Sequence, residues 1–142
     1  MKGPSIQGND ATFNMVQPLL FDFFSSIEKT PRIGAHLRFA HAETIIPFAT
    51  ILQIPGISDQ PVDRTDLYTY EKNNWRGDRV SPMAANIQWD IFQHRTDSNR
   101  ILVRMLYNEI EVKFKSDCSP ITKNSFFYDF DELKRAYAHF LS

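Results

Sequence analysis

Hydrophobic residues recur with helical spacing in three parts of the chain. The first stretch follows the i, i+3, i+4, i+7 rule at Met15, Val16, Leu19, Leu20, Phe23, Phe24 and Ile27. This spacing predicts a core-packing helix from Thr12, capped by Thr12 or Asp10 and either kinked or started late by Pro18. A second helix is predicted at 43–52; it is apolar nearly all round and therefore buried. A third begins near Asp131.

Apolar residues at every second position predict two strands, at 84–93 and at 101–109, where Val103, Met105 and Tyr107 share one face. The polar segment 94–100 between them predicts an antiparallel hairpin, which 112–118 extends. A short apolar run at 35–39 predicts a buried strand that leads directly into the helix at 43–52.

The remaining segment, 55–84, carries three prolines and little periodicity. It is interpreted as a long surface excursion, because long loops without regular structure are often functional. Tyr68, Tyr70 and Trp75 are expected to anchor it to the rest of the molecule.

Composition narrows the classes of function. The length of 142 residues predicts one domain, 1–142, and a net charge of −1 gives no reason to expect nucleic acid or an anionic membrane as partner. No apolar run approaches the ~20 residues of a membrane span, and the first five residues have no apolar core of a signal peptide. Cys118 is the single cysteine, so an internal disulfide and a multi-thiolate zinc site are excluded. It is expected to be a small buried or half-buried thiol.

The candidate chemistry lies where the strand at 35–39 meets the helix at 43–52. His41 and Glu43 follow the strand, and a helix N-terminus is an anion site. From spacing alone, a structural histidine in the core is the commonest outcome. A metal site with His36 is disfavoured because residues 36 and 41 of a strand point to opposite faces, and a serine hydrolase lacks Gly-x-Ser-x-Gly. The remaining interpretation is acid–base catalysis at a phosphate group. In it, His41 and the amides of the helix bind the anion, and Glu43 donates a proton to the leaving oxygen.

The order of short motifs carries a family resemblance. It begins with Leu37-Arg38-Phe39 followed by His41-Ala42-Glu43-Thr44, and continues through 69–77, 81–90, 103–109 and Lys2-Gly3-Pro4. Together they resemble the histidine acid phosphatases, in particular the multiple inositol polyphosphate phosphatase branch, whose second active-site motif reads His-Ala-Glu. The matches cover nearly the whole chain in the right order.

The resemblance implies an α/β fold related to phosphoglycerate mutase, of which this chain is the C-terminal part, with helices packed on a mixed sheet. It implies a hydrolase of phytate and other inositol polyphosphates in which a histidine takes the phosphoryl group before water releases it. Carried over by motif position, Glu43 is the proton donor and His41 contacts the phosphoryl group. Arg38 and Thr44 are further candidate substrate contacts, although Arg38 also suits a surface salt bridge and Thr44 a helix cap. No metal or organic cofactor is expected, and relatives of this kind are secreted, periplasmic or in the ER lumen.

One family motif is missing. The nucleophile of these enzymes lies in Arg-His-Gly-x-Arg-x-Pro, and this sequence has no such motif. We therefore expect the chain to carry the acid without the nucleophile, to have no turnover alone, and to need an N-terminal half of the same fold as partner. The alternatives are a non-catalytic phosphate-binding or interaction module and an inactive remnant.

Overall fold

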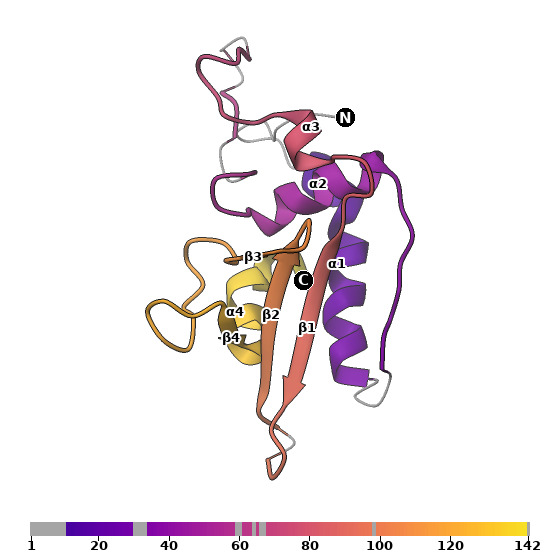
Figure 1. Cartoon of the computed structure of the whole chain (residues 1–142), viewed down its shortest axis with the longest axis vertical. Helices are drawn as coiled ribbons and strands as arrows, with labels where there is room; N and C mark the ends of the chain where they lie inside the picture. The colour runs from indigo at the N-terminus through magenta and orange to yellow at the C-terminus, as the bar shows by residue number, and fades with distance from the viewer. Residues whose placement is uncertain are drawn as a thin grey trace.

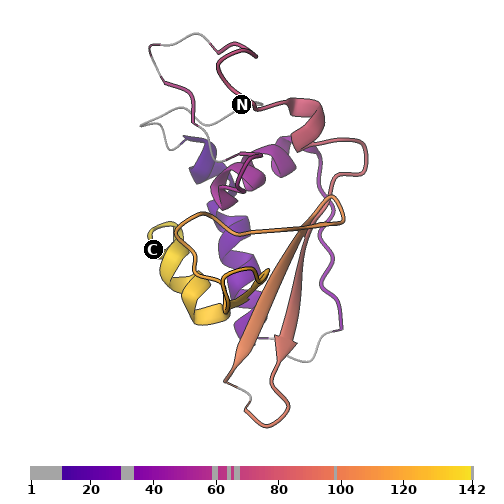
Figure 2. The same ribbon diagram turned by 60° about the vertical axis from the view of Figure 1, so that its left-hand side comes forward.

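The computed structural model describes residues 11–29, 34–58, 61–63, 65, 68–97 and 99–141. Four helices and four strands are present in this part of the chain, in the order α1 (Ala11–Lys29), α2 (Ala42–Leu52), α3 (Gly77–Val80), β1 (Ile87–Gln93), β2 (Ile101–Tyr107), β3 (Ile110–Val112), β4 (Phe127–Asp129) and α4 (Phe130–Leu141). The long helix α1 runs beside the β1–β2 hairpin, and α2 crosses near one end of it (Figures 1 and 2). None of the described helices has the length and apolar character to span a membrane.

The sheet is organised around β2. Along its whole length β2 pairs with β1, and its other edge is shared by β3, opposite residues 105–107, and β4, opposite residues 102–104. The α/β class and the predicted hairpin are confirmed, with the strands shortened to 87–93 and 101–107. Each of the three described pairings is antiparallel, whereas a mixed sheet was expected of the family fold.

The predicted extension over 112–118 is wrong beyond Val112, where β3 ends. The backbone there leaves the sheet, and the three residues of β4 take the vacated edge of β2 instead. Such a short strand has no sequence signal of its own, because its conformation is set by the strand it pairs with.

The core lies between the sheet, α1, α2 and α4. One face of β2 is buried and consists of Val103, Met105 and Tyr107. Rings from different elements meet there edge to face, with Trp89 5.3 Å from Phe114 between ring centroids. The apolar stripes of the helices thus find their partners across the sheet.

The helices begin close to their predicted positions. In α1 the first helical residue is Ala11, so Thr12 lies inside the helix and is buried instead of capping it, while Asp10 lies outside the described residues. Pro18 is accommodated within the helix. The buried helix α2 starts one residue before the prediction and ends at Leu52, followed by the C-cap residue Gln53, whose backbone is left-handed with φ 50°. The last helix is confirmed, beginning at Phe130.

The predicted strand at 35–39 is wrong. This segment is extended but pairs with no other described strand. It is also not buried, since Leu37 is 73% and Phe39 93% exposed. An extended segment forms a β-strand only when a neighbouring strand makes backbone hydrogen bonds with it. Among the described residues, no strand pairs with residues 35–39 in this way.

In the excursion at 55–84 the three predicted aromatic residues contact one another, and of these three Trp75 packs against the hydrophobic core. The Tyr68 hydroxyl donates a hydrogen bond to the Trp75 carbonyl at 2.5 Å, and the Tyr68 ring meets that of Tyr70 edge to face. The short helix α3, which the sequence pattern did not predict, follows and buries Val80.

Candidate functional site

His41 and Glu43 lie at the N-terminal end of α2. His41 is the N-cap residue, with extended backbone at φ −114° and ψ 175°. Its carbonyl accepts the N–H groups of Thr44 at 2.9 Å and Ile45 at 3.1 Å, while its side chain makes no capping hydrogen bond. Glu43 occupies the first turn. The amides and the dipole at this end of a helix favour negative charge, so an anion placed beside His41 would be stabilised.

Both side chains are exposed. The interpretation of His41 as a structural histidine of the core is therefore wrong, because the segment that carries it runs along the surface. Its imidazole can meet a ligand directly.

Arg38 is held against α1. Its Nε donates to Asp22 Oδ2 at 2.5 Å and its Nη2 to Ser26 Oγ at 2.8 Å. The guanidinium also lies over the Phe23 ring, 4.4 Å from the centroid, and contacts His36 Nδ1 at 3.2 Å. These contacts attach the extended segment to the helix just before His41. A contact of Arg38 with substrate stays a prediction.

Thr44 is the third residue of α2 and half-buried. It does not cap the helix, since His41 is the N-cap. Across the described ranges, no group of three or more His, Cys, Asp and Glu side chains is placed to hold a metal ion, so His36, His41 and Glu43 do not form such a cluster.

A groove of about 920 Å³ leads to this helix end. The extended segment 34–40 forms one side and residues 85–93 the other, while Phe23 and Ile27 of α1 lie between them. Thr44 and Ile45 belong to its lining as well. The candidate site thus stands where an open, largely apolar groove meets the start of α2.

Cys118 is buried, as predicted. Burial, followed by the nearby charge of Asp117, raises the pKa of this thiol to about 12. Because the thiolate is the nucleophile in cysteine chemistry, Cys118 in its folded environment is not a candidate to replace the missing histidine.

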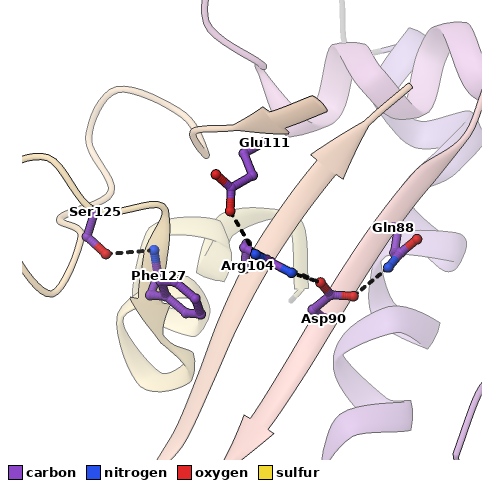
Figure 3. Close-up of polar contacts among 6 residues, drawn as sticks. All are labelled: Gln88, Asp90, Arg104, Glu111, Ser125 and Phe127. Carbon is purple, nitrogen blue, oxygen red and sulfur yellow. Dashed lines mark hydrogen bonds and ion pairs between the residues drawn. The ribbon is translucent and has the colours of Figure 1, made fainter. Parts of the chain in front are cut away.

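A polar cluster on the outer face of the sheet was not predicted. Arg104 on β2 donates to Asp90 Oδ2 on β1 at 2.5 Å and to Glu111 Oε1 on β3 at 2.8 Å (Figure 3). Burial alone would raise the pKa of Asp90, but hydrogen bonds from Gln88 and Arg104 outweigh it and lower that pKa. Asp90 and Arg104 face each other in the register, so this pair could have been found from the sequence once the hairpin turn was placed. The cluster links β1, β2 and β3, and such opposite-charge pairs between strands stabilise a sheet.

The architecture and the exposed His-Ala-Glu at a helix start define the class of protein. The family model of the histidine phosphatase superfamily (branch 2) matches residues 19–108, and the chain belongs to this family. The matched range includes α2 with the candidate site and both strands of the hairpin.

The relatives that this chain resembles include multiple inositol polyphosphate phosphatases. The chain is 32% identical over 76 residues to multiple inositol polyphosphate phosphatase 1 of Dictyostelium discoideum, covering 54% of this chain and 12% of that protein. Its structure is similar to that of the Bifidobacterium longum multiple inositol polyphosphate phosphatase in complex with inositol hexasulfate, with a TM-score of 0.84 and 45% identity. The complex of that enzyme with phosphate matches with a TM-score of 0.82 and 43% identity.

This chain is much shorter than the Bifidobacterium chains that it matches. The two Bifidobacterium structures cover 99% of this chain, whereas this chain covers 29% and 30% of theirs. The predicted family and fold are therefore confirmed, and the chain spans less than a third of the solved structures that it resembles.

Proposed function

We propose that this chain supplies the proton-donor side of a phosphatase active site that acts on inositol polyphosphates. The observation that carries the proposal is the exposed pair His41 and Glu43 at the N-terminal end of α2, in a chain of the histidine phosphatase superfamily. The homologous enzyme with 45% identity is a multiple inositol polyphosphate phosphatase, which supports this substrate class.

In a complete active site, this chain would provide the proton donor and another part of the fold the nucleophile. A histidine outside this sequence attacks phosphorus and forms a phosphohistidine, while the bond from phosphorus to the inositol oxygen breaks. Glu43 gives its proton to that leaving oxygen. His41 and the first-turn amides of α2 stabilise the charge on the transferring phosphoryl group, and water then releases the phosphate from the nucleophile.

Thr44 and Arg38 have supporting parts in this proposal. Thr44 lies one residue after Glu43 and borders the groove, where its hydroxyl is available to a phosphate oxygen. Arg38 would have to exchange Asp22 and Ser26 for a phosphate to contact substrate. Its present hydrogen bonds favour a second task, which is to position the segment that carries His41.

A chimeric enzyme tests the role of Glu43. Residues of the Bifidobacterium longum enzyme that match this chain are replaced by this chain, and phosphate release from inositol hexakisphosphate is measured. We expect turnover that Glu43→Gln lowers by about 10²- to 10⁴-fold in kcat, the range for removing a general acid. Substrates with a good leaving group, such as nitrophenyl phosphate, should lose much less because they need no proton.

The matched control is Glu71→Gln, which removes an exposed carboxylate elsewhere in the same chain. It should leave turnover unchanged. An active chimera that tolerates Glu43→Gln as well as it tolerates Glu71→Gln would contradict the assignment.

A second candidate function is a phosphate-binding module without turnover. It is favoured by the sequence itself, which contains no Arg-His-Gly-x-Arg-x-Pro. The isolated chain is then expected to bind inositol hexakisphosphate in calorimetry and to release no phosphate from it. His41→Ala should weaken this binding, whereas His94→Ala, at an exposed histidine of the hairpin connector, should not. Phosphate release that Glu43→Gln abolishes in the isolated chain would overturn both the module and the missing nucleophile.

A further inference from the structure

Arg38 attaches the extended segment 34–40 to helix α1. This segment leads directly into the start of α2 (Figure 1), and no described strand pairs with residues 35–39. Among the described residues, the hydrogen bonds and ion pairs of segment 34–40 all involve the guanidinium of Arg38. The polar contacts that fix the backbone just before His41 therefore pass through this one side chain.

Three neighbouring side chains of α1 receive that guanidinium. Its Nε and Nη2 each lie 2.5 Å from Asp22 Oδ2, and Nη2 also donates a hydrogen bond to Ser26 Oγ at 2.8 Å. Asp22 and Ser26 are four residues apart, so one turn of the helix places both on the same face. The guanidinium also lies over the Phe23 ring, 4.4 Å from its centroid, in a cation–π contact. We call Asp22, Phe23 and Ser26 the Arg38 cradle.

His36 makes the fourth contact of Arg38. The Nη2 atom of Arg38 lies 3.2 Å from His36 Nδ1, and because a guanidinium only donates hydrogen bonds, the imidazole nitrogen is the acceptor. Side chains two residues apart in an extended chain point to the same side. His36 and Arg38 therefore both lie on the side of the segment that faces α1, and that side is the one the cradle holds.

The cradle fixes geometry more than it stabilises the fold. The side chains of Arg38 and Asp22 are 21% and 51% exposed, and ion pairs that solvent reaches contribute little to stability. Leu37 and Phe39, on either side of Arg38, are 73% and 93% exposed, so loosening the segment uncovers no core. Loss of the cradle would instead displace His41, three residues further along the chain, together with the start of α2.

We infer that Asp22 is a positioning residue of the phosphatase site, which acts through Arg38 to fix the backbone that presents His41 and Glu43. The inference deepens the proposed function and rests on it, since these two side chains are the ones that must be placed. Arg38 then serves this task and not substrate contact, because Asp22 already neutralises the guanidinium. A general acid must lie within hydrogen-bond reach of the oxygen that it protonates, and a small displacement lowers the rate steeply.

The chimeric enzyme described above tests this role with Asp22→Asn, which keeps the size of the side chain and removes the charge that binds Arg38. We expect kcat for inositol hexakisphosphate to fall about 10- to 100-fold, as for a misplaced catalytic group. The fall should be much smaller with nitrophenyl phosphate, whose leaving group needs no proton. Loss of folded protein would lower both rates equally, so their ratio separates positioning from structural damage. An unchanged ratio in Asp22→Asn would overturn the inference.

Glu28→Gln is the matched control on the same helix. Glu28 is also 51% exposed and pairs with Lys134 Nζ of α4 at 3.4 Å. Its removal breaks an ion pair of α1 of the same kind, but it releases nothing that leads to His41. Both rates should stay unchanged in this control. A control that changes the ratio as much as Asp22→Asn would show that the effect is not specific to the Arg38 cradle, and the role of Asp22 would be wrong.

A double-mutant cycle separates positioning from substrate contact. If Asp22 acts through Arg38, the double variant Asp22→Asn/Arg38→Gln should be no slower than Arg38→Gln alone, because the two substitutions break the same interaction. If Arg38 instead contacts substrate, Arg38→Gln should raise KM, whereas Asp22→Asn should not, since it frees the guanidinium to bind phosphate. Effects that multiply in the double variant, or a KM effect confined to Arg38→Gln, would overturn the inference.

A second measurement needs no turnover. In the chain itself, the NMR order parameters of the backbone amides at 39–41 should fall in Asp22→Asn and not in Glu28→Gln. Unchanged order parameters in Asp22→Asn would overturn the inference. The proposed function fails differently, since it is refuted by a chimera that is insensitive to Glu43→Gln. A chimera that Glu43→Gln impairs and Asp22→Asn does not would refute the positioning role alone.

Discussion

The two sides of helix α1 meet very different surroundings. On the side facing the sheet and α4, Val16, Leu20 and Phe24 are 3% exposed or less. Leu19 and Phe23 directly precede Leu20 and Phe24 in the sequence and lie on the neighbouring side of α1. They are half-buried and line the open groove. The first side is covered by the chain's own rings, whereas the second borders the groove.

We therefore expect the closed side of α1 to determine the stability of the chain and the open side to determine what the chain binds. The closed side contains the aromatic core, in which the Phe114 ring lies 5.1 Å from that of Tyr128. The open side carries His41 and Glu43. Substitutions should therefore divide into those that unfold the chain and those that leave it folded but change what it binds.

The largest effect is expected on the closed side. Leu133 on α4 is fully buried, so Leu133→Ala should lower the free energy of unfolding by about 2–5 kcal/mol through lost burial and a residual cavity. Urea denaturation followed by circular dichroism measures it. The matched control is Leu37→Ala beside the groove, 73% exposed, which should cost less than about 0.5 kcal/mol. Similar losses at both positions would contradict the division.

A hydrogen bond across the core gives the next effect. The Tyr137 hydroxyl donates to the Leu52 carbonyl at 2.8 Å and ties α4 to the end of α2. Tyr137→Phe leaves that buried carbonyl without its donor, and we expect a loss of about 1–3 kcal/mol in the free energy of unfolding. Tyr70→Phe, at a ring 65% exposed, is the control. An unchanged midpoint for Tyr137→Phe would show that water replaces the hydroxyl and that the core is less closed than described.

Low pH is expected to lower the free energy of unfolding because Glu132, on the closed side, becomes protonated. Hydrogen bonds from Arg135 and from the Ser119 amide lower the pKa of Glu132 from 4.5 to about 2. Because the folded-state pKa is the lower one, the stabilisation is complete above about pH 4.5 and is lost as the pH falls toward 2. Glu132→Gln should flatten the decline in unfolding free energy over this window, measured by urea titrations at several pH values. A decline as steep as that of the Glu71→Gln control would exclude Glu132 as its source.

The smallest effect on stability is expected at the open side. His41 is exposed and makes no side-chain cap, so His41→Ala should change the free energy of unfolding by less than about 0.5 kcal/mol. The same variant should weaken binding of inositol hexakisphosphate. A thermal melt and a calorimetric titration on one sample check both. A destabilised variant would mean that His41 supports the fold, and the two sides would no longer differ in kind.

The sequence by itself determined the elements with long, regular periodicity. The stripes of α1, α2 and α4 and the alternation of the hairpin identify their own conformations, because the side chains repeat with the period of the backbone. The motif around His41 and Glu43 likewise identified the family, and nothing in the local sequence of α3 or β4 indicated either element.

Only the tertiary structure decided what surrounds these elements. Residues 35–39 have a strand-like sequence but remain unpaired, since a ladder needs a neighbour that the described chain does not provide. For the same reason His41 is exposed where a buried strand had been expected. Whether an apolar run becomes a strand, and whether a histidine lies in a core or at an open site, depends on contacts between segments far apart in the sequence.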